Sequence, residues 1–162
     1  MEPLHLPAAR LEAFIASAFE RTGVSPADAA TVAALMTEAD LQGSDGHGIF
    51  RLPQYVRRIR AGGMNPHGRP RILRERAGMA LVDGDNALGH LVMKFAAETA
   101  IAKAGVAGAA WVGVRNGNHA GPASLYAKMP MRADMIGLYL AVGNANHLPP
   151  WGGVDMLLST NP

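Results

Sequence analysis

The chain has 162 residues, of which 49% are hydrophobic and 17% are charged, so it can bury an apolar core and is not expected to be disordered. It contains no cysteine, which excludes disulfides, thiolate metal sites and cysteine nucleophiles. The net charge of +2 is too small to indicate a nucleic-acid partner, and no apolar run is long enough to predict a membrane-spanning helix.

The first third of the chain is predicted to be helical. Residues 8–22 carry apolar side chains at the spacing of an amphipathic helix. A second helix has a clear start, because Ser25 is a suitable N-cap, Pro26 suits the first helical position, and Asp28 completes a capping box. We expect this second helix to end at Gly43.

A glycine-rich loop separates the second helix from a third. Residues 43–48 contain three glycines, which disfavour a helix there. Pro53 is tolerated only in the first turn of a helix, so the third helix should begin near Ile49 or Phe50. Residues 64–71 carry proline and glycine and are expected to form an extended connector.

Strands and helices alternate in the middle of the chain. Residues 71–74 and 79–83 are predicted to pair as a hairpin. A long helix over about 87–104 and a strand over 109–114 follow, and a polar turn over 115–121 comes next.

The last third is expected to hold one more helix and one more strand. A short helix is predicted over 122–132, and Pro130 should bend or end it. Residues 135–142 are apolar and are predicted to form a strand buried on both faces, while residues 143–162 are expected to be loop.

This order of elements predicts an α/β fold. A helical segment (residues 1–70) precedes the first part of an α/β domain (residues 71–162). The sequence has no G-x-G-x-x-G, no P-loop and no G-x-S-x-G, so it carries no Rossmann fingerprint, no nucleotide-binding P-loop and no nucleophile elbow.

His47 is the first candidate catalytic residue. It lies in the glycine-rich loop just before a helix start, and Arg51 follows four residues later. The N-terminus of a helix favours anions, so Arg51 can hold a carboxylate there, and His47 with a pKa near neutrality suits proton transfer beside it. The alternative is a loop histidine that only bonds to backbone.

His119 is the second candidate. It lies in the polar turn after the strand predicted over 109–114, and ligands of open α/β sheets gather at the carboxyl ends of strands. Asn116 and Asn118 beside it can orient an imidazole or contact a ligand amide. The alternative is an ordinary turn, since Asn-Gly is a favoured turn dipeptide.

The remaining histidines give weaker signals. We considered a metal site formed by Asp45, His47, His119 and His147. No two of these residues have the spacing that puts two ligands on one face of a helix, so no metal is predicted. We interpret His5, His67 and His90 as surface or structural residues.

Basic residues are concentrated in one stretch. Between Arg51 and Arg76 there are eight arginines and one acid, Glu75. The stretch is either an anion-binding surface for phosphate or carboxylate groups or a solvated helix face followed by a basic loop.

Several longer motifs occur in order along nearly the whole chain. They are A-D-x-x-G-x-x-x-H-G-I-x-R-x-P-x-Y over residues 39–55, G-x-x-N-P over 62–66, V-D-G-D-N-x-x-G over 82–89, V-R-N-x-N-H-x-G over 114–121, M-I-G over 135–137, P-W-G-G over 150–153 and T-N-P over 160–162. Together these motifs resemble the malate/L-lactate dehydrogenase-like family, whose relatives include sulfolactate and ureidoglycolate dehydrogenases, diketogulonate reductase and piperideine-2-carboxylate reductases.

The resemblance implies a fold and an activity. It implies a helical N-terminal segment followed by part of a non-Rossmann, NAD(P)-binding mixed sheet with helices. It also implies a cytoplasmic homodimer that uses NAD or NADP to interconvert a 2-oxo acid and a 2-hydroxy acid, or a cyclic imine carboxylate and its reduced form, with neither nucleic acid nor a membrane as partner.

The resemblance also assigns residues. His47 matches the catalytic acid/base histidine of the family, Arg51 matches its substrate-binding arginine, and His119 matches a second active-site histidine. The stretches that line the cofactor site in the family correspond to Gly143, Asn144, Asn146, Thr160 and Asn161.

Two positions depart from the family pattern. Gly46 stands where the family has a serine, and Pro130 interrupts a helix that is usually continuous. Family members are about twice as long, so the alternative expectation is a truncated, catalytically inactive remnant that acts at most as a dimerising module.

Overall fold

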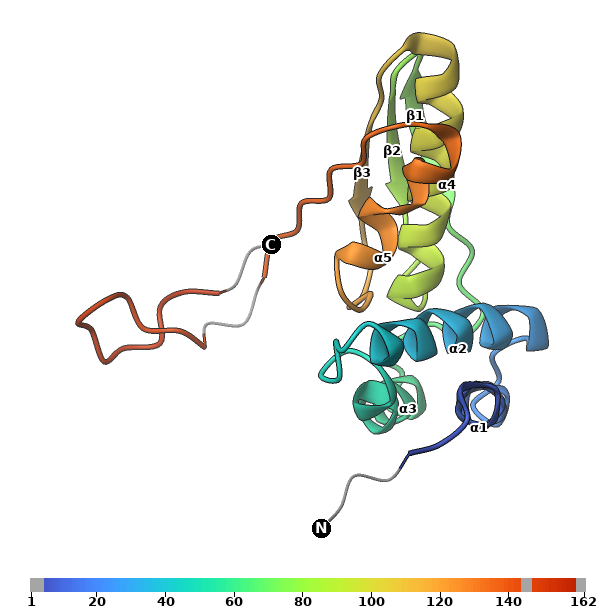
Figure 1. Cartoon of the computed structure of the whole chain (residues 1–162), viewed down its shortest axis with the longest axis vertical. Helices are drawn as coiled ribbons and strands as arrows, with labels where there is room; N and C mark the ends of the chain where they lie inside the picture. Colours follow the sequence, from blue (N-terminus) through green and yellow to red (C-terminus); the bar gives the residue numbers. More distant parts are fainter. Residues whose placement is uncertain (1–4, 144–146, 160–162) are drawn as a thin grey trace.

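A computed structural model describes residues 5–143 and 147–159. Three helices come first: α1 (Ala8–Glu20), α2 (Pro26–Leu41) and α3 (Leu52–Arg60). Helix α2 lies between the other two helices and the α/β part of the molecule (Figure 1). The three predicted helices are therefore confirmed.

The helices enclose the larger apolar core of the described chain. Apolar side chains from one face of each helix meet there, and burying them excludes water from the space between the helices. Leu88 joins this core from the loop before the long helix, so the helical layer and the α/β layer share packing. The buried members are Ile15, Phe19, Val24, Ala29, Val32, Ala33, Met36, Leu52, Tyr55, Ile59, Met64 and Leu88.

Helix α2 begins as its sequence predicts. The backbone N–H of Asp28 donates to Ser25 Oγ (3.2 Å), and the Ser25 hydroxyl donates to the Asp28 carboxylate (2.7 Å). The cap gives a partner to one of the N–H groups that a helix start leaves unpaired. The prediction that Ser25 is the N-cap is confirmed.

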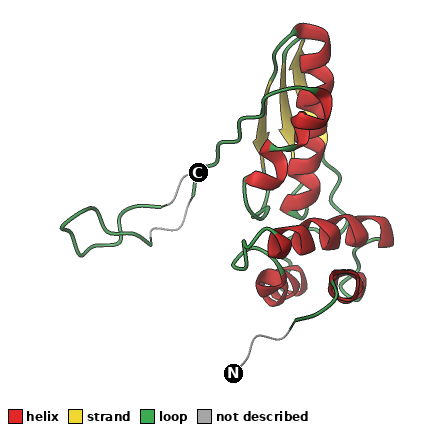
Figure 2. Ribbon diagram, viewed as in Figure 1, coloured by secondary structure: helices red, strands yellow, loops and turns green. Residues whose placement is uncertain are grey.

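The α/β part is a three-stranded mixed sheet with helices beside it. Strands β1 (Arg71–Arg76) and β2 (Met79–Asp83) are antiparallel, and β3 (Trp111–Arg115) pairs with β2 in parallel. The long helix α4 (Gly89–Ala107) connects β2 to β3 and packs along the sheet (Figure 2). A parallel pair needs such a crossover, so the predicted hairpin, long helix and third strand are confirmed as an α/β fold.

The predicted helix over 122–132 is broken into two short pieces. Helix α5 (Ser124–Ala127) is followed by the 3-10 turn η2 (Met129–Ala133). Pro130 lies in η2, because its missing N–H and the clash of its ring with the carbonyl four residues earlier do not fit a continuing α-helix. The expectation that Pro130 ends the helix is confirmed.

The strand predicted over 135–142 is wrong. These residues are extended, but they belong to none of the strands of the described chain. Every second side chain in this segment is half-buried against the body. One example is Tyr139, whose ring stacks on that of Tyr126 with centroids 5.7 Å apart. The alternate side chains are exposed, and they are Ile136, Leu138, Leu140 and Val142. The apolar sequence thus produces an extended backbone, but a strand also needs a neighbouring backbone to pair with.

The described residues 147–159 lie away from the body of the molecule (Figure 1). Residues 147–159 are loop, as predicted, with one isolated antiparallel bridge between Leu148 and Leu158. None of the helices in the described ranges is long and apolar enough to cross a membrane. The division of the chain at residue 70 stays a prediction.

Candidate active site

The loop that carries His47 is held by the last turn of α2. The carboxylate of Asp40 accepts a hydrogen bond from the backbone N–H of Ile49 (2.8 Å). Ile49 begins the 3-10 turn η1 (Ile49–Arg51), which leads directly into α3. The backbone N–H of His47 donates to the Ser44 carbonyl (2.8 Å). The third helical segment therefore starts where Pro53 predicts, and His47 is fixed just before it.

Gly48 makes this arrangement possible. A Cβ at residue 48 would lie 1.9 Å from Asp40 Oδ1, so only glycine leaves room for the carboxylate that caps η1. We expect Gly48→Ala to displace Asp40 and to lower the free energy of unfolding by about 1 kcal/mol, the usual effect of losing a helix cap. Chemical denaturation of the native protein measures the change.

Gly46 provides the matched control. A Cβ at residue 46 meets nothing within 4 Å. Gly46→Ala should therefore leave the free energy of unfolding unchanged within about 0.5 kcal/mol. Equal destabilisation by the two substitutions would contradict the role given to Gly48.

Arg51 lies beside the His47 loop. Its Nε donates to the Gly46 carbonyl (2.7 Å), and its Nη1 donates to Gln54 Oε1 (3.0 Å). These bonds orient the guanidinium group of the half-buried Arg51, and its remaining N–H donors suit a carboxylate.

The turn that carries His119 is anchored to the loop after β2. Asn118 Nδ2 donates to the carbonyls of Asn86 (3.0 Å) and Ala87 (2.8 Å), and Asn116 Nδ2 donates to Asp83 Oδ1 (3.2 Å). Asn118 therefore holds backbone in place, and Asn116 pairs with the Asp83 carboxylate. Within the described residues, neither amide bonds to an imidazole, which was one of the two roles that the sequence suggested. A side-chain amide has two N–H donors, and the amide of Asn118 satisfies two backbone carbonyls at once.

The structure brings His47 and His119 together. Their rings stack with centroids 5.4 Å apart. The Tyr55 hydroxyl lies 2.6 Å from His119 Nδ1, and the backbone N–H of Gly121 points to the same nitrogen at 3.4 Å. The site lies where the helical layer meets the loops at the carboxyl ends of the parallel strands β2 and β3, which is the usual place for a ligand in an α/β sheet.

Both imidazoles are neutral at pH 7. Burial, together with the nearby charge of Arg51 and the ring of His47, lowers the pKa of His119 to about 4. Burial also lowers the pKa of His47, again helped by Arg51. The unshifted value is about 6.5, so both rings have lost the added proton at neutral pH.

A third histidine, His90, also belongs to this cluster. It is 1% exposed, its ring meets that of Tyr55 edge-on with centroids 5.7 Å apart, and burial lowers its pKa to about 3, helped by His119 and His47. Its Nε2 has no hydrogen-bond partner within the described ranges. The sequence interpretation of His90 as a surface or structural residue missed this contact. The sequence feature that could have indicated burial of His90 is its position directly between Gly89 and the inward-facing Leu91.

Comparison with known proteins identifies the family. The family described as malate/L-lactate dehydrogenase matches residues 6–162. The chain belongs to this family. It is similar to malate dehydrogenase of Pyrococcus horikoshii, with 40% identity over 160 residues, which cover 98% of this chain and 44% of that protein. It is also similar to L-sulfolactate dehydrogenase of Methanocaldococcus jannaschii, with 38% identity over 148 residues, which cover 91% of this chain and 43% of that protein.

Solved structures of malate/L-lactate dehydrogenase family members agree with this fold. The structure of malate dehydrogenase from Pyrococcus horikoshii superimposes with a TM-score of 0.91 at 39% identity, covering 98% of this chain and 45% of that one. The chain therefore spans less than half the length of these relatives. The predicted family resemblance, restricted to the N-terminal half of its members, is confirmed.

The cofactor residues that the family resemblance assigned are not tested. Asn144, Asn146, Thr160 and Asn161 lie outside the described residues, and Gly143 directly follows the extended residues 135–142. His147 is exposed, and its backbone N–H donates to the Leu158 carbonyl (2.9 Å). Within residues 5–143 and 147–159, no group of three or more histidine, aspartate or glutamate side chains is arranged to hold a metal ion.

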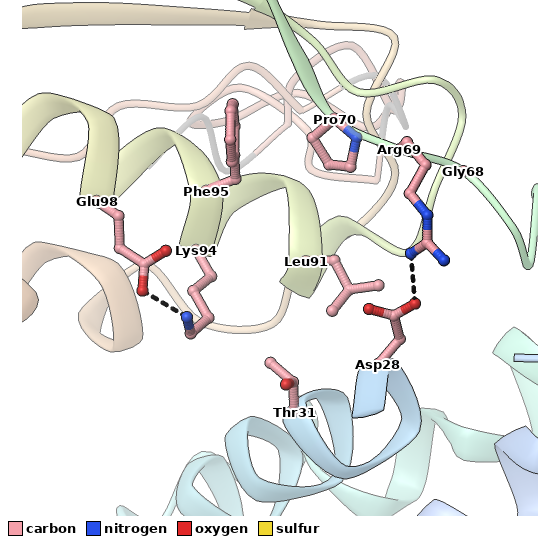
Figure 3. Close-up of a pocket in the computed structure, with 9 residues that line it drawn as sticks. All are labelled: Asp28, Thr31, Gly68, Arg69, Pro70, Leu91, Lys94, Phe95 and Glu98. Carbon is pink, nitrogen blue, oxygen red and sulfur yellow. Dashed lines mark hydrogen bonds and ion pairs between the residues drawn. The ribbon is translucent and has the colours of Figure 1, made fainter. Parts of the chain in front are cut away.

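The arginine-rich stretch does not form a single surface. Arg58 Nη2 donates to Asn118 Oδ1 (3.0 Å) near the active site, whereas Arg69 pairs with Asp28 (2.7 Å) in a separate hollow between α2 and α4 (Figure 3). Lys94 in that hollow pairs with Glu98. The described cations of the hollow therefore have acidic partners, and Arg51 remains the arginine best placed to bind an anionic substrate.

Proposed function

We propose that the protein containing this chain is an NAD(P)-dependent oxidoreductase that transfers a hydride between the nicotinamide ring and a 2-hydroxy or 2-oxo acid of the malate or lactate kind, or a cyclic imine carboxylate. The observation that carries the proposal is the pair of stacked, neutral imidazoles of His47 and His119 beside the guanidinium of Arg51. The family membership of the chain supports it.

Arg51 and the histidines divide the work in this proposal. Arg51 binds the substrate carboxylate and so fixes the neighbouring carbon, C2, near the two imidazoles. In the oxidation of a 2-hydroxy acid, the neutral His47 accepts the proton of the C2 hydroxyl as the hydride leaves C2. In reduction, the protonated His47 returns that proton to the oxygen or nitrogen on C2, with His119 orienting the substrate or taking over the donor role. General acid catalysis of this type is worth about 10²–10⁴-fold in rate.

The side chains of the site are compatible with a nicotinamide cofactor. The imidazoles can transfer a proton, and the guanidinium can bind an anion. Neither group can supply a hydride, so these side chains suit a site in which a bound cofactor supplies it. When bound, NADH or NADPH supplies the hydride to C2. Gly143, Asn144, Asn146, Thr160 and Asn161 remain the residues proposed to contact it.

We also propose that the native protein is a cytoplasmic homodimer. A chain without cysteine is compatible with a reducing compartment. The exposed apolar row of Ile136, Leu138, Leu140 and Val142 is surface that water does not favour and that further protein would cover.

A substrate panel tests the proposed function. The native protein is mixed with NADH or NADPH and with a series of 2-oxo acids and cyclic imine carboxylates, and the loss of reduced-nicotinamide absorbance is recorded. At least one carboxylate substrate should be reduced, and its carboxamide analogue should react at least about 10-fold more slowly, because the amide has no charge for Arg51 to bind. No cofactor oxidation with any compound of the panel would contradict the proposal.

Arg51 should not be replaceable by lysine. An ammonium group does not reproduce the planar pair of donors that binds a carboxylate, so Arg51→Lys is expected to lower kcat/KM by about 10-fold or more, mainly through KM. Steady-state kinetics with the best substrate of the panel measures this. A change within about twofold, which is about 0.4 kcal/mol, would show that Arg51 does not bind the carboxylate.

A further inference from the structure

Tyr55 is buried against the imidazole of His119 and has no role in the function proposed above. It lies on α3, one turn after Arg51, and is 2% exposed. Its ring contacts Phe19, with centroids 6.4 Å apart, as well as the edge of His90. Packing on both sides leaves the hydroxyl group little freedom, and that group lies 2.6 Å from His119 Nδ1.

We propose that Tyr55 is a positioning residue that fixes the tautomer of His119, so that the ring presents Nε2–H to the substrate. This inference rests on the proposed function for the identity of the substrate. The tautomer itself follows from contacts within the chain and can be measured without any substrate.

The direction of the hydrogen bonds decides the tautomer. A backbone N–H can only donate, and that of Gly121 points to Nδ1 of His119. Nδ1 is therefore an acceptor without a proton, and the Tyr55 hydroxyl donates to it. A neutral imidazole carries one proton, which then resides on Nε2.

The surroundings keep Tyr55 in the form that donates. Burial raises the pKa of the Tyr55 hydroxyl, although the positive charge of Arg51 opposes this, so the group stays protonated at neutral pH. Tyr55 therefore acts on the substrate only through His119, and the same helical segment supplies both the carboxylate-binding Arg51 and the group that orients the His119 ring.

Nitrogen NMR of the imidazoles tests the inference directly. The native protein is labelled with nitrogen-15 at histidine, and the signals of His119 are assigned by their loss in His119→Asn. The expected result is an unprotonated Nδ1 and a protonated Nε2 in the wild type, and a shift of both signals toward a tautomer mixture in Tyr55→Phe. A proton on Nδ1 in the wild type, or unchanged signals in Tyr55→Phe, would overturn the inference.

Kinetics with a matched control separates positioning from simple stabilisation. Tyr126 is also buried, and its hydroxyl donates to the backbone carbonyl of Ala120 in the same turn, not to a ring nitrogen of His119. Tyr55→Phe should lower kcat by about 10-fold while KM changes less than about twofold. Tyr126→Phe should lower the melting temperature but leave the His119 signals and kcat unchanged.

The two substitutions also distinguish this inference from the proposed function. If both variants changed kcat equally and left the tautomer intact, Tyr55 would be structural only and the inference would be wrong. If the wild type reduced no substrate of the panel while its His119 carried the proton on Nε2 and lost this preference in Tyr55→Phe, the proposed function would fail and the tautomer assignment would hold.

Discussion

Replacing His47 with glutamine in the native protein is expected to lower kcat for reduction of a 2-oxo acid by about 10²-fold or more. Glutamine keeps a polar side chain of similar length, but its amide cannot transfer a proton to the developing alkoxide. The fold should persist, because the His47 side chain is only partly buried and stacks on the ring of His119. Steady-state kinetics together with thermal unfolding checks both parts of the expectation.

Two further variants show whether a loss of kcat in His47→Gln identifies His47 as the proton donor. His119→Gln shows how much of the rate depends on the second imidazole. His67 is exposed on the connector before β1, and His67→Gln should leave kcat unchanged within about twofold. Near-normal kcat in His47→Gln combined with a large loss in His119→Gln would assign the proton donor to His119 instead.

Replacing Gly89 with alanine is expected to have the largest effect on stability. A Cβ at this first residue of α4 would lie 2.2 Å from the Asn118 carbonyl oxygen and 2.4 Å from that of His119. Backbone atoms cannot move aside as the end of a flexible side chain can, so the turn must shift. We expect the free energy of unfolding to fall by about 1–3 kcal/mol, as for overpacking elsewhere.

The same substitution should also impair catalysis, since the turn that must shift carries His119. We expect kcat to fall by about 10-fold at a temperature where Gly89→Ala is still folded, because small misplacements of a catalytic group reduce the rate strongly. Denaturant unfolding and kinetics on the same preparation measure the two effects.

Gly105, near the other end of α4, is the control for Gly89. A Cβ there would make an ordinary contact, 3.7 Å from Met135 Cε. Alanine is a better helix former than glycine by about 1 kcal/mol, so Gly105→Ala should leave stability unchanged or raise it by up to that amount. Similar destabilisation by both substitutions would show that the clash at Gly89 is not the cause.

Local features of this chain were predictable from the sequence because neighbouring residues alone produce them. The N-cap at Ser25 and the start of the third helical segment before Pro53 depend on φ, ψ and nearby donors. The hairpin of β1 and β2 and the break at Pro130 have similarly local causes. The spacing of His47 and Arg51 also survives folding, because one short helical segment places both at its start.

Only the tertiary structure decided which residues meet at the site. Residues 135–142 have the apolar composition of a strand, yet pairing depends on a neighbouring backbone that the described chain does not provide. The position of His90 between Gly89 and Leu91 could not show what it contacts, because its burial beside Tyr55 arises only when α4 packs against the helical layer. The contact between Tyr55 and His119 likewise joins a helix to a distant turn. Hydrogen-bond direction and burial belong to the assembled chain, and they decide which nitrogen of His119 carries the proton.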